Sequence, residues 1–316
     1  MDERVALVRS PSSRMAEGIV TYGDRAPADA GLAATQHAAY VAAVAAAGWE
    51  IREVPHADDL PDSAFVEDTV VVCGDLAVLT LPGADERRAE LAGTEEAVRG
   101  LGLELARIEE PGTLDGGDVL RVGTTLYAGR GGRTNAEGIR QLRRLVAPGG
   151  FAVVPVPLHR VLHLKSAVTA LPDGTVIAAD PSLIDSSPFP TMRIVPEEAG
   201  SHVILLGGGT VLMAASAPRS AELFDDWGFD VVVVDIGEFE KMEGCVTCLS
   251  VLIHPGADGA PQPAPGCDEA QRSTPSPAGP RRPGLGHARP CTAGRTVARV
   301  GAQGSPRPGR RGGSAW

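Results

Sequence analysis

The sequence has few cysteines, few aromatic residues and no long apolar run, and each shortage excludes a class of protein. Of its 316 residues five are Cys and 4% are aromatic, and Cys73, Cys245 and Cys248 lie in or beside strand-like runs. Such a sparse, odd cysteine count argues for reduced thiols rather than a disulfide framework. No stretch reaches ~18 consecutive apolar residues, and residues 1–11 lack the regions of a secretion signal. We therefore expect a cytoplasmic protein with no membrane contact.

Negative charge is concentrated in the first 254 residues. The net charge is −11, but residues 255–316 contain nine Arg, no Lys and three acidic residues, so they carry +6 and residues 1–254 carry −17. An acidic body disfavours nucleic acid and suits a cationic small molecule, although a plain solvated surface explains the same charge. We expect a small cationic ligand and no nucleic-acid partner.

The chain divides into a folded region and a tail. With 43% apolar content, it can bury a core without a disulfide or a structural metal. Residues 255–316 hold 11 Pro and 12 Gly and show no periodic apolar pattern, a composition that buries too little surface to offset chain entropy. We predict one folded domain at 1–254 and a disordered tail at 255–316. The sequence is compatible with a homodimer.

One pattern recurs before the tail: two short β-rich runs around a glycine turn, often followed by a helix and a further strand. Repeats of strand-strand-helix-strand at this period predict an α/β fold of blades around an axis, with function where the loops meet. A conventional parallel α/β sheet is the alternative, and the hairpins count against it. The hairpins are predicted at 70–81, 119–128, 167–178 and 203–213, helices at 32–47, 85–101, 135–145 and 219–227, and further strands at 5–8 and 231–234.

A glycine-bearing loop leads from Lys241 to Cys248 and runs into the strand-like segment 249–253. A thiol presented on such a loop is a candidate nucleophile if an electropositive neighbour lowers its pKa. A buried structural cysteine explains the same position. Cys245 lies three residues earlier, so the Cys-x-x-Cys spacing also suggests a redox or zinc motif, although no second pair accompanies it.

His163 stands between Leu162 and Leu164, just before a hairpin-like run. An imidazole between apolar neighbours is partly desolvated and poised near neutrality, as a general acid or base requires. A core histidine whose hydrogen bonds are satisfied is the ordinary explanation of the same setting.

Carboxylates gather where two strands are predicted to begin. Asp62, Glu67 and Asp68 precede the run at 70–81, and Asp115 and Asp118 flank a Gly-Gly turn before the run at 119–128. A planar guanidinium offers five donors in a fixed fork that carboxylates accept in pairs, so such groupings suit a cationic ligand. Asp and Gly are also ordinary turn formers.

Five short motifs occur in a fixed order along residues 5–253. They are Phe-Val-Glu-Asp at 65–68, Leu-Asp-Gly-Gly-Asp at 114–118, Arg-Thr-Asn at 133–135, Leu-His-Leu-Lys at 162–165 and Thr-Cys-Leu-Ser at 247–250. Together they resemble the dimethylarginine dimethylaminohydrolase family of guanidino-modifying enzymes. Each motif alone is weak evidence, but chance does not readily explain five motifs in this order.

The resemblance implies a five-bladed α/β propeller that converts asymmetric dimethylarginine, and monomethylarginine, to citrulline and an amine without metal or cofactor. Cys248 is implied to attack the guanidinium carbon and form a covalent thiouronium. His163 is implied to protonate the departing amine and then to deprotonate water, with Asp115 orienting its ring.

The same resemblance implies the substrate-binding residues. Asp68 would hold one edge of the guanidinium, and Arg87 and Arg133 the carboxylate of the amino acid. The amine would lie near Asp62 and the backbone around Ile19 and Met242. The full implied set is Ile19, Asp62, Phe65, Glu67, Asp68, Arg87, Arg133 and Met242.

Cys245 and the long tail depart from the family pattern. A residue without a thiol is expected at position 245, and a Cys245–Cys248 disulfide would silence the enzyme. Three rival functions stay open: an arginine deiminase or a hydrolase of another substituted guanidine, a thiol redox protein, and a binding module without turnover.

Overall fold

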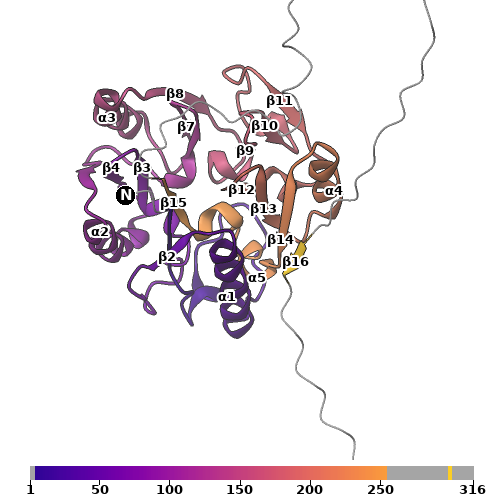
Figure 1. Cartoon of the computed structure of the whole chain (residues 1–316). Helices are drawn as coiled ribbons and strands as arrows, with labels where there is room; N and C mark the ends of the chain where they lie inside the picture. The colour runs from indigo at the N-terminus through magenta and orange to yellow at the C-terminus, as the bar shows by residue number, and fades with distance from the viewer. Residues whose placement is uncertain (1–3, 255–297, 301–316) are drawn as a thin grey trace, which may run out of the picture.

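The computed structural model describes residues 4–254 and 298–300, in which short strands form five separate sheets. The sheets surround a common centre, and helices α1 to α4 lie on the outside of the ring (Figure 1). Each sheet combines an antiparallel pair of strands with a further strand that runs parallel to its neighbour. The predicted five-bladed α/β propeller is confirmed, and the conventional parallel sheet is excluded.

In four sheets the strands follow one another along the chain, and the first two form a hairpin. At two of the hairpin turns, Gly74 and Gly123 have φ of 58° and 59°, a left-handed conformation that costs glycine little. The second sheet contains β3 (Val70–Cys73), β4 (Leu76–Leu79) and β5 (Glu104–Arg107), and the third β6 (Val119–Val122), β7 (Thr125–Arg130) and β8 (Ala152–Pro157). The fourth contains β9 (Val168–Ala170), β10 (Val176–Ala178) and β11 (Met192–Ile194), and the fifth β12 (Val203–Gly207), β13 (Thr210–Ala214) and β14 (Asp230–Val234).

The remaining sheet joins the two ends of the folded region. Strand β1 (Val5–Val8) lies between β2 (Glu50–Glu53), with which it is parallel, and β15 (Val251–Ile253), with which it is antiparallel. The ring is therefore closed by hydrogen bonds between the first and last strands of residues 4–254.

The crossover helices match the predictions at three of four places: α1 (Ala30–Ala46), α3 (Ala136–Val146) and α4 (Pro218–Asp226). Asp29 and Asn135 begin α1 and α3, and their side chains accept hydrogen bonds from N–H groups of the first turn. The helix predicted at 85–101 is split into a 3₁₀ helix, η3 (Asp85–Glu90), followed by α2 (Leu91–Gly100). The buried side chain of Arg87 lies in η3 and binds Glu90 at the end of the same 3₁₀ helix.

Several shorter helices lie between the strands of the described residues. The fourth sheet has the 3₁₀ helix η7 (Pro181–Leu183) between β10 and β11, where the other sheets have an α-helix, and α5 (Gly237–Glu240) lies between β14 and β15. No helix within residues 4–254 and 298–300 is long and apolar enough to cross a membrane.

The predicted tail falls outside the described residues except at 298–300. There β16 (Ala298–Val300) pairs in parallel with β14 and adds a fourth strand to the fifth sheet. The rest of the tail lies outside the described residues, so its predicted disorder stays a prediction.

Candidate active site

Five 3₁₀ turns surround the centre of the ring, and they shortly precede strands β3, β6, β9, β12 and β15, one in each sheet. The predicted reactive residues Asp68, Asp115, His163 and Cys248 stand in or at the start of four of them. The fivefold arrangement thus gathers side chains that are far apart in the sequence. The turns are η2 (Val66–Thr69), η4 (Gly116–Asp118), η6 (Leu164–Ser166), η8 (Glu198–Ser201) and η9 (Val246–Leu249).

Two glycines allow the turns η2 and η4 to touch. A Cβ atom on Gly116 would lie 2.0 Å from the Glu67 carbonyl oxygen, and one on Gly117 would lie 2.8 Å from His163 Nδ1. The N–H of Gly117 donates a hydrogen bond of 2.9 Å to Asp68 Oδ1. The Gly-Gly pair therefore lets the backbones of η2 and η4 approach closely beneath His163, in addition to forming the turn that the sequence suggested.

His163 is buried between two carboxylates from other sheets. Its Nε2 lies 2.9 Å from Asp115 Oδ2, and its Nδ1 lies 3.8 Å from Asp68 Oδ1. Burial opposes a charge on the ring, but the carboxylates, including that of Asp118, outweigh it and raise the pKa of His163 to about 9. The sequence predicted an imidazole near neutrality; the structure instead favours an imidazolium before substrate binds, because carboxylates distant in the sequence surround the ring.

Arg87 holds Asp68 in its ionised form. Its Nη1 binds Asp68 Oδ2, its Nε and Nη2 bind both oxygens of Glu90, and Nη2 also donates to the Phe65 carbonyl at 3.1 Å. Burial disfavours the Asp68 carboxylate, but His163 and Arg87 more than compensate and keep the pKa of Asp68 at about 2. A permanent negative charge therefore faces the centre of the site.

A small cavity opens beside these residues. It brings together nine of the eleven residues that the sequence proposed, and three that it missed: Leu162, Glu243 and Gly244. Leu162 directly precedes His163, so the motif itself contained a signal for it. The nine proposed residues are Ile19, Asp62, Phe65, Asp68, Arg87, Arg133, His163, Met242 and Cys248.

The loop after η1 (Met15–Glu17) lies against this cavity and is held by acidic side chains. Asp62 accepts hydrogen bonds from the N–H of Ile19 at 3.2 and 3.1 Å, and burial raises the pKa of Asp62. Arg133 Nη2 donates a hydrogen bond of 3.3 Å to Thr21 Oγ1 in the same loop, and Arg133 Nη1 lies 3.7 Å from Asp115 Oδ2. A cationic and an anionic side chain therefore face the loop from the body of the ring.

Glu243 fixes the next part of the loop. Its carboxylate accepts three hydrogen bonds of 2.6 Å, from the backbone N–H groups of Thr21, Tyr22 and Gly23. Glu243 has φ of 60°, which is uncommon for a side-chain-bearing residue and aims its carboxylate at the loop. No sequence signal identified this contact, because the acceptor and its backbone donors lie at opposite ends of the folded region.

Cys248 lies in η9 with its sulfur close to that of Cys245. The two Sγ atoms are 3.3 Å apart, and the Cys245 N–H donates to Cys248 Sγ at 3.4 Å. The hydroxyl of Tyr40, on α1, donates to the Val246 carbonyl at 2.9 Å and so fixes the turn. The hydrogen bond with Cys245 and burial raise the pKa of the Cys248 thiol, and nearby carboxylates raise it further.

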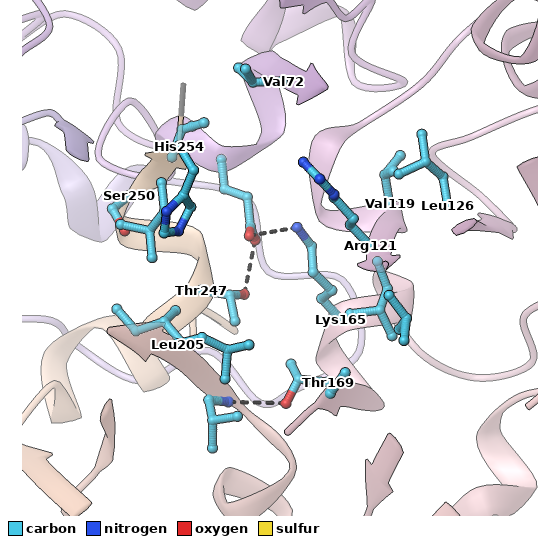
Figure 2. A pocket seen from close by; sticks show the side chains of 18 of the residues that line it. Val72, Val119, Arg121, Leu126, Lys165, Thr169, Leu205, Thr247, Ser250 and His254 are labelled. Carbon is cyan, nitrogen blue, oxygen red and sulfur yellow. Dashed lines mark hydrogen bonds and ion pairs between the residues drawn. The ribbon is translucent and has the colours of Figure 1, made fainter. Parts of the chain in front are cut away.

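A second, larger cavity of about 590 Å³ lies beyond the turns, among residues of β3, β6, β9, β12 and β15, one strand from each sheet. Glu67, Lys165 and Thr247 line its end nearest the turns: Lys165 Nζ donates to Glu67 Oε1 at 2.6 Å and Thr247 Oγ1 to Glu67 Oε2 at 2.9 Å. Figure 2 labels Lys165 and Thr247 and marks their contacts with this carboxylate by dashed lines. Burial raises the pKa of Glu67 to about 7, although Lys165 opposes the rise.

Two proposed residues, Glu67 and Asp115, do not line the small cavity. Asp115 is fully buried behind His163, where its Oδ1 also accepts the N–H of Gly83 at 2.8 Å. Glu67 borders the larger cavity instead. Substrate binding by Glu67 stays a prediction, and its observed partners are Lys165 and Thr247.

The centre of the site also has the spacing of a metal site. Asp68, Asp115 and His163 offer ligand atoms that all lie within 4.8 Å of one another. The same buried anionic pocket suits a planar guanidinium, whose N–H groups carboxylates accept in pairs. The absence of a bound metal in the reaction stays a prediction.

Comparison with known proteins gives extensive sequence matches, although no protein-family model matches the chain. N(G),N(G)-dimethylarginine dimethylaminohydrolase of Streptomyces coelicolor is 61% identical over 253 residues, which cover 80% of this chain and 98% of that relative. The protein of the same name from Pseudomonas aeruginosa is 34% identical over 248 residues, covering 78% and 97%.

Solved structures of dimethylarginine dimethylaminohydrolases also match the chain over most of its length. A variant dimethylarginine dimethylaminohydrolase in an adduct with S-methyl-L-thiocitrulline aligns with a TM-score of 0.75 at 32% identity, over 80% of this chain and 100% of that one. A variant of the Pseudomonas aeruginosa enzyme complexed with citrulline aligns over the same shares with a TM-score of 0.73 at 32% identity. The N-terminal domain of a cyanobacterial arginine dihydrolase shares the fold, with a TM-score of 0.72 at 19% identity over 80% of this chain and 98% of that one.

Proposed function

The chain belongs to the dimethylarginine dimethylaminohydrolase family, and we propose that it hydrolyses asymmetric dimethylarginine to citrulline and dimethylamine. Monomethylarginine would yield citrulline and methylamine by the same route. One observation carries the proposal: His163, held between Asp68 and Asp115, lines the same buried cavity as Cys248. An acid, a nucleophile and anionic groups for a cation thus meet in one place.

The guanidinium would bind where the carboxylates converge. Asp68 is ionised and fixed by Arg87, so it offers a preorganised acceptor for one edge of the planar cation. In our proposal Asp115 accepts a further N–H while it orients His163. Water has little room in such a site, and the electrostatic contacts are correspondingly stronger than in solution.

Substrate charge would also activate the nucleophile. Cys248 has a raised pKa, which favours the neutral thiol. A guanidinium bound beside it would lower that pKa, since an opposite charge favours the thiolate. We propose that the thiolate then attacks the guanidinium carbon and forms a C–S bond.

His163 would move protons in both halves of the reaction. Its pKa of about 9 favours the imidazolium, the form needed to protonate the departing dimethylamine as the C–N bond breaks. The resulting thiouronium remains on Cys248. The neutral imidazole would then remove a proton from water, which attacks the same carbon; the C–S bond breaks, and citrulline leaves.

The amino-acid end of the substrate would lie toward the loop side of the cavity. Arg133 and Arg87 are proposed to attract the carboxylate, and Asp62 the amine together with the backbone at Ile19 and Met242. Phe65 is proposed to pack against the substrate's aliphatic chain. We propose a cytoplasmic enzyme that needs no metal, cofactor, nucleic acid or membrane.

Citrulline and amine release test the proposal, measured side by side with asymmetric dimethylarginine and arginine in the presence of a reductant. We expect citrulline and dimethylamine from the first and little product from the second. Cys248→Ser is expected to lose turnover by at least about 10³-fold, because the nucleophile initiates every later step. Citrulline and ammonia from arginine would identify a deiminase instead.

A further inference from the structure

Cys245 is a buried thiol for which the proposed reaction has no use. It does not line the small cavity, yet its sulfur lies 3.3 Å from the sulfur of Cys248 and 3.3 Å from Thr247 Oγ1. A disulfide bond is about 2.05 Å long, so the two sulfurs must approach by roughly 1.3 Å to bond. Rotation of two side chains within one short 3₁₀ turn covers such a distance.

We propose that Cys245 and Cys248 form an oxidant-sensitive modification site, in which peroxide converts the pair to a reversible disulfide that removes the nucleophile. The inference rests on the proposed role of Cys248 in turnover. Its structural basis is the direct contact of the two sulfurs in η9.

The reaction balances with hydrogen peroxide as oxidant. The pKa of Cys248 is raised and that of Cys245 lowered, so the Cys248 thiol must first pass its proton to Cys245 across their direct contact. The Cys248 thiolate then attacks one peroxide oxygen; an S–O bond forms, the O–O bond breaks and hydroxide leaves. The Cys245 sulfur then attacks the resulting sulfenic acid, its thiol proton leaves with the displaced hydroxyl as water, and the S–S bond forms. The two sulfurs together lose two electrons, and peroxide gains them.

The positions of the two sulfurs assign their roles. Both thiols are nearly buried, at 6% exposed for Cys248 and 4% for Cys245, but Cys248 lines the small cavity and Cys245 does not. Cys73, the third cysteine of the described residues, is buried in the separate cluster around β3, β6 and β7 and cannot replace Cys245. Cys245 is therefore the resolving thiol.

The experiment uses the full chain with Cys73→Ser, Cys267→Ser and Cys291→Ser, so that only the pair remains. The protein is exposed to graded hydrogen peroxide, quenched, and divided for citrulline assay and for mass spectrometry of the peptide containing both cysteines. We expect the peptide to lose two hydrogens and the activity to fall in proportion. Dithiothreitol should restore both.

Cys245→Ser in the same background is the matched control, and Cys245→Ala is the second variant if the first fails to fold. Either variant should turn over substrate in reductant, but peroxide should now oxidise Cys248 to the sulfinic acid, and dithiothreitol should not restore activity. Reversible inactivation without the internal disulfide, or equal recovery in the Cys245 variants, would overturn the proposal. A disulfide that forms in a protein releasing no citrulline even when reduced would preserve the modification site and refute the catalytic function.

Discussion

Asp115 and His163 reach each other from two neighbouring sheets, and their 2.9 Å contact fixes the orientation of the imidazole. Asp115 stands at the start of the turn before β6, and His163 at the start of the turn before β9. The acid of the proposed reaction is thus oriented by a residue that contacts it only when both sheets are in place.

Replacing Asp115 by Asn tests that orientation. The amide has nearly the same shape but no charge, so the imidazolium loses one of its stabilising carboxylates, and the ring can take the wrong tautomer. We expect kcat to fall by about 10²- to 10⁴-fold, as for other general acid–base groups that lose their orienting carboxylate. Steady-state citrulline release measures it. Asp180→Asn, at the cap of η7, is the control and should leave kcat unchanged.

His163 should make stability depend on pH in a defined window. Its pKa is raised from 6.5 to about 9, so its contribution to stability is fully present below pH 6.5 and is lost as pH rises through about 9. We expect the wild-type protein to exceed His163→Gln in melting temperature by more below pH 6.5 than above pH 9. A difference that is the same at both ends would refute the raised pKa.

Glu67 should influence the pKa of Cys248. The Glu67 carboxylate is among the causes of the raised pKa of Cys248, so Glu67→Gln should lower that pKa and speed alkylation of the thiol at neutral pH. The rate of iodoacetamide labelling at Cys248, followed against pH by peptide mass spectrometry, measures the effect. A labelling rate that is unchanged or slower in Glu67→Gln would contradict an electrostatic effect of this carboxylate on the thiol.

Glu243 should control substrate affinity more than chemistry. Glu243→Gln weakens three charged hydrogen bonds to the loop at 21–23, which then has to be ordered by the substrate itself. We expect KM to rise by roughly tenfold, or about 1.4 kcal/mol, with a smaller effect on kcat. Glu222→Gln, at an exposed position of α4, is the matched control. An unchanged KM would show that the loop keeps its position without this carboxylate.

Removal of residues 256–316 should leave turnover intact. Within this segment the structure describes only β16, which pairs with the last strand of the fifth sheet rather than with a strand that borders the larger cavity. We expect unchanged kcat and KM and a modest fall in melting temperature, because an edge of β14 is exposed. A truncated protein that folds, by circular dichroism, but releases no citrulline would contradict this expectation.

Local patterns predicted the blades because the controlling interactions are local. The hairpins depend on glycine turns within a few residues of each strand, and the starts of α1 and α3 depend on capping side chains at Asp29 and Asn135. The helix at 85–101 was only half correct. Its first turn is shaped by the burial of Arg87 against Asp68, a contact between different elements that periodicity does not record.

The site was predicted as a set of residues but not as an environment. The motifs and the family resemblance together named nine residues that line one cavity, yet the raised pKa of His163 and the position of Glu67 beside the larger cavity depend on distances across the ring. Glu243 was missed because its carboxylate accepts hydrogen bonds from backbone N–H groups, and the type of a residue does not reveal what its backbone binds. The sequence therefore identifies which residues form the site more readily than it predicts their charge states.

The antiparallel pairing of β1 with β15 has a kinetic consequence. Contacts between the two ends of a chain are slow to form, because the cost of closing the intervening loop precedes any gain from the pairing. Cys248 lies immediately before β15, so the nucleophile is positioned only when this last pairing is complete. During refolding, the recovery of activity should therefore lag behind the recovery of helical and strand content, and enzyme assays would report the final closure of the ring.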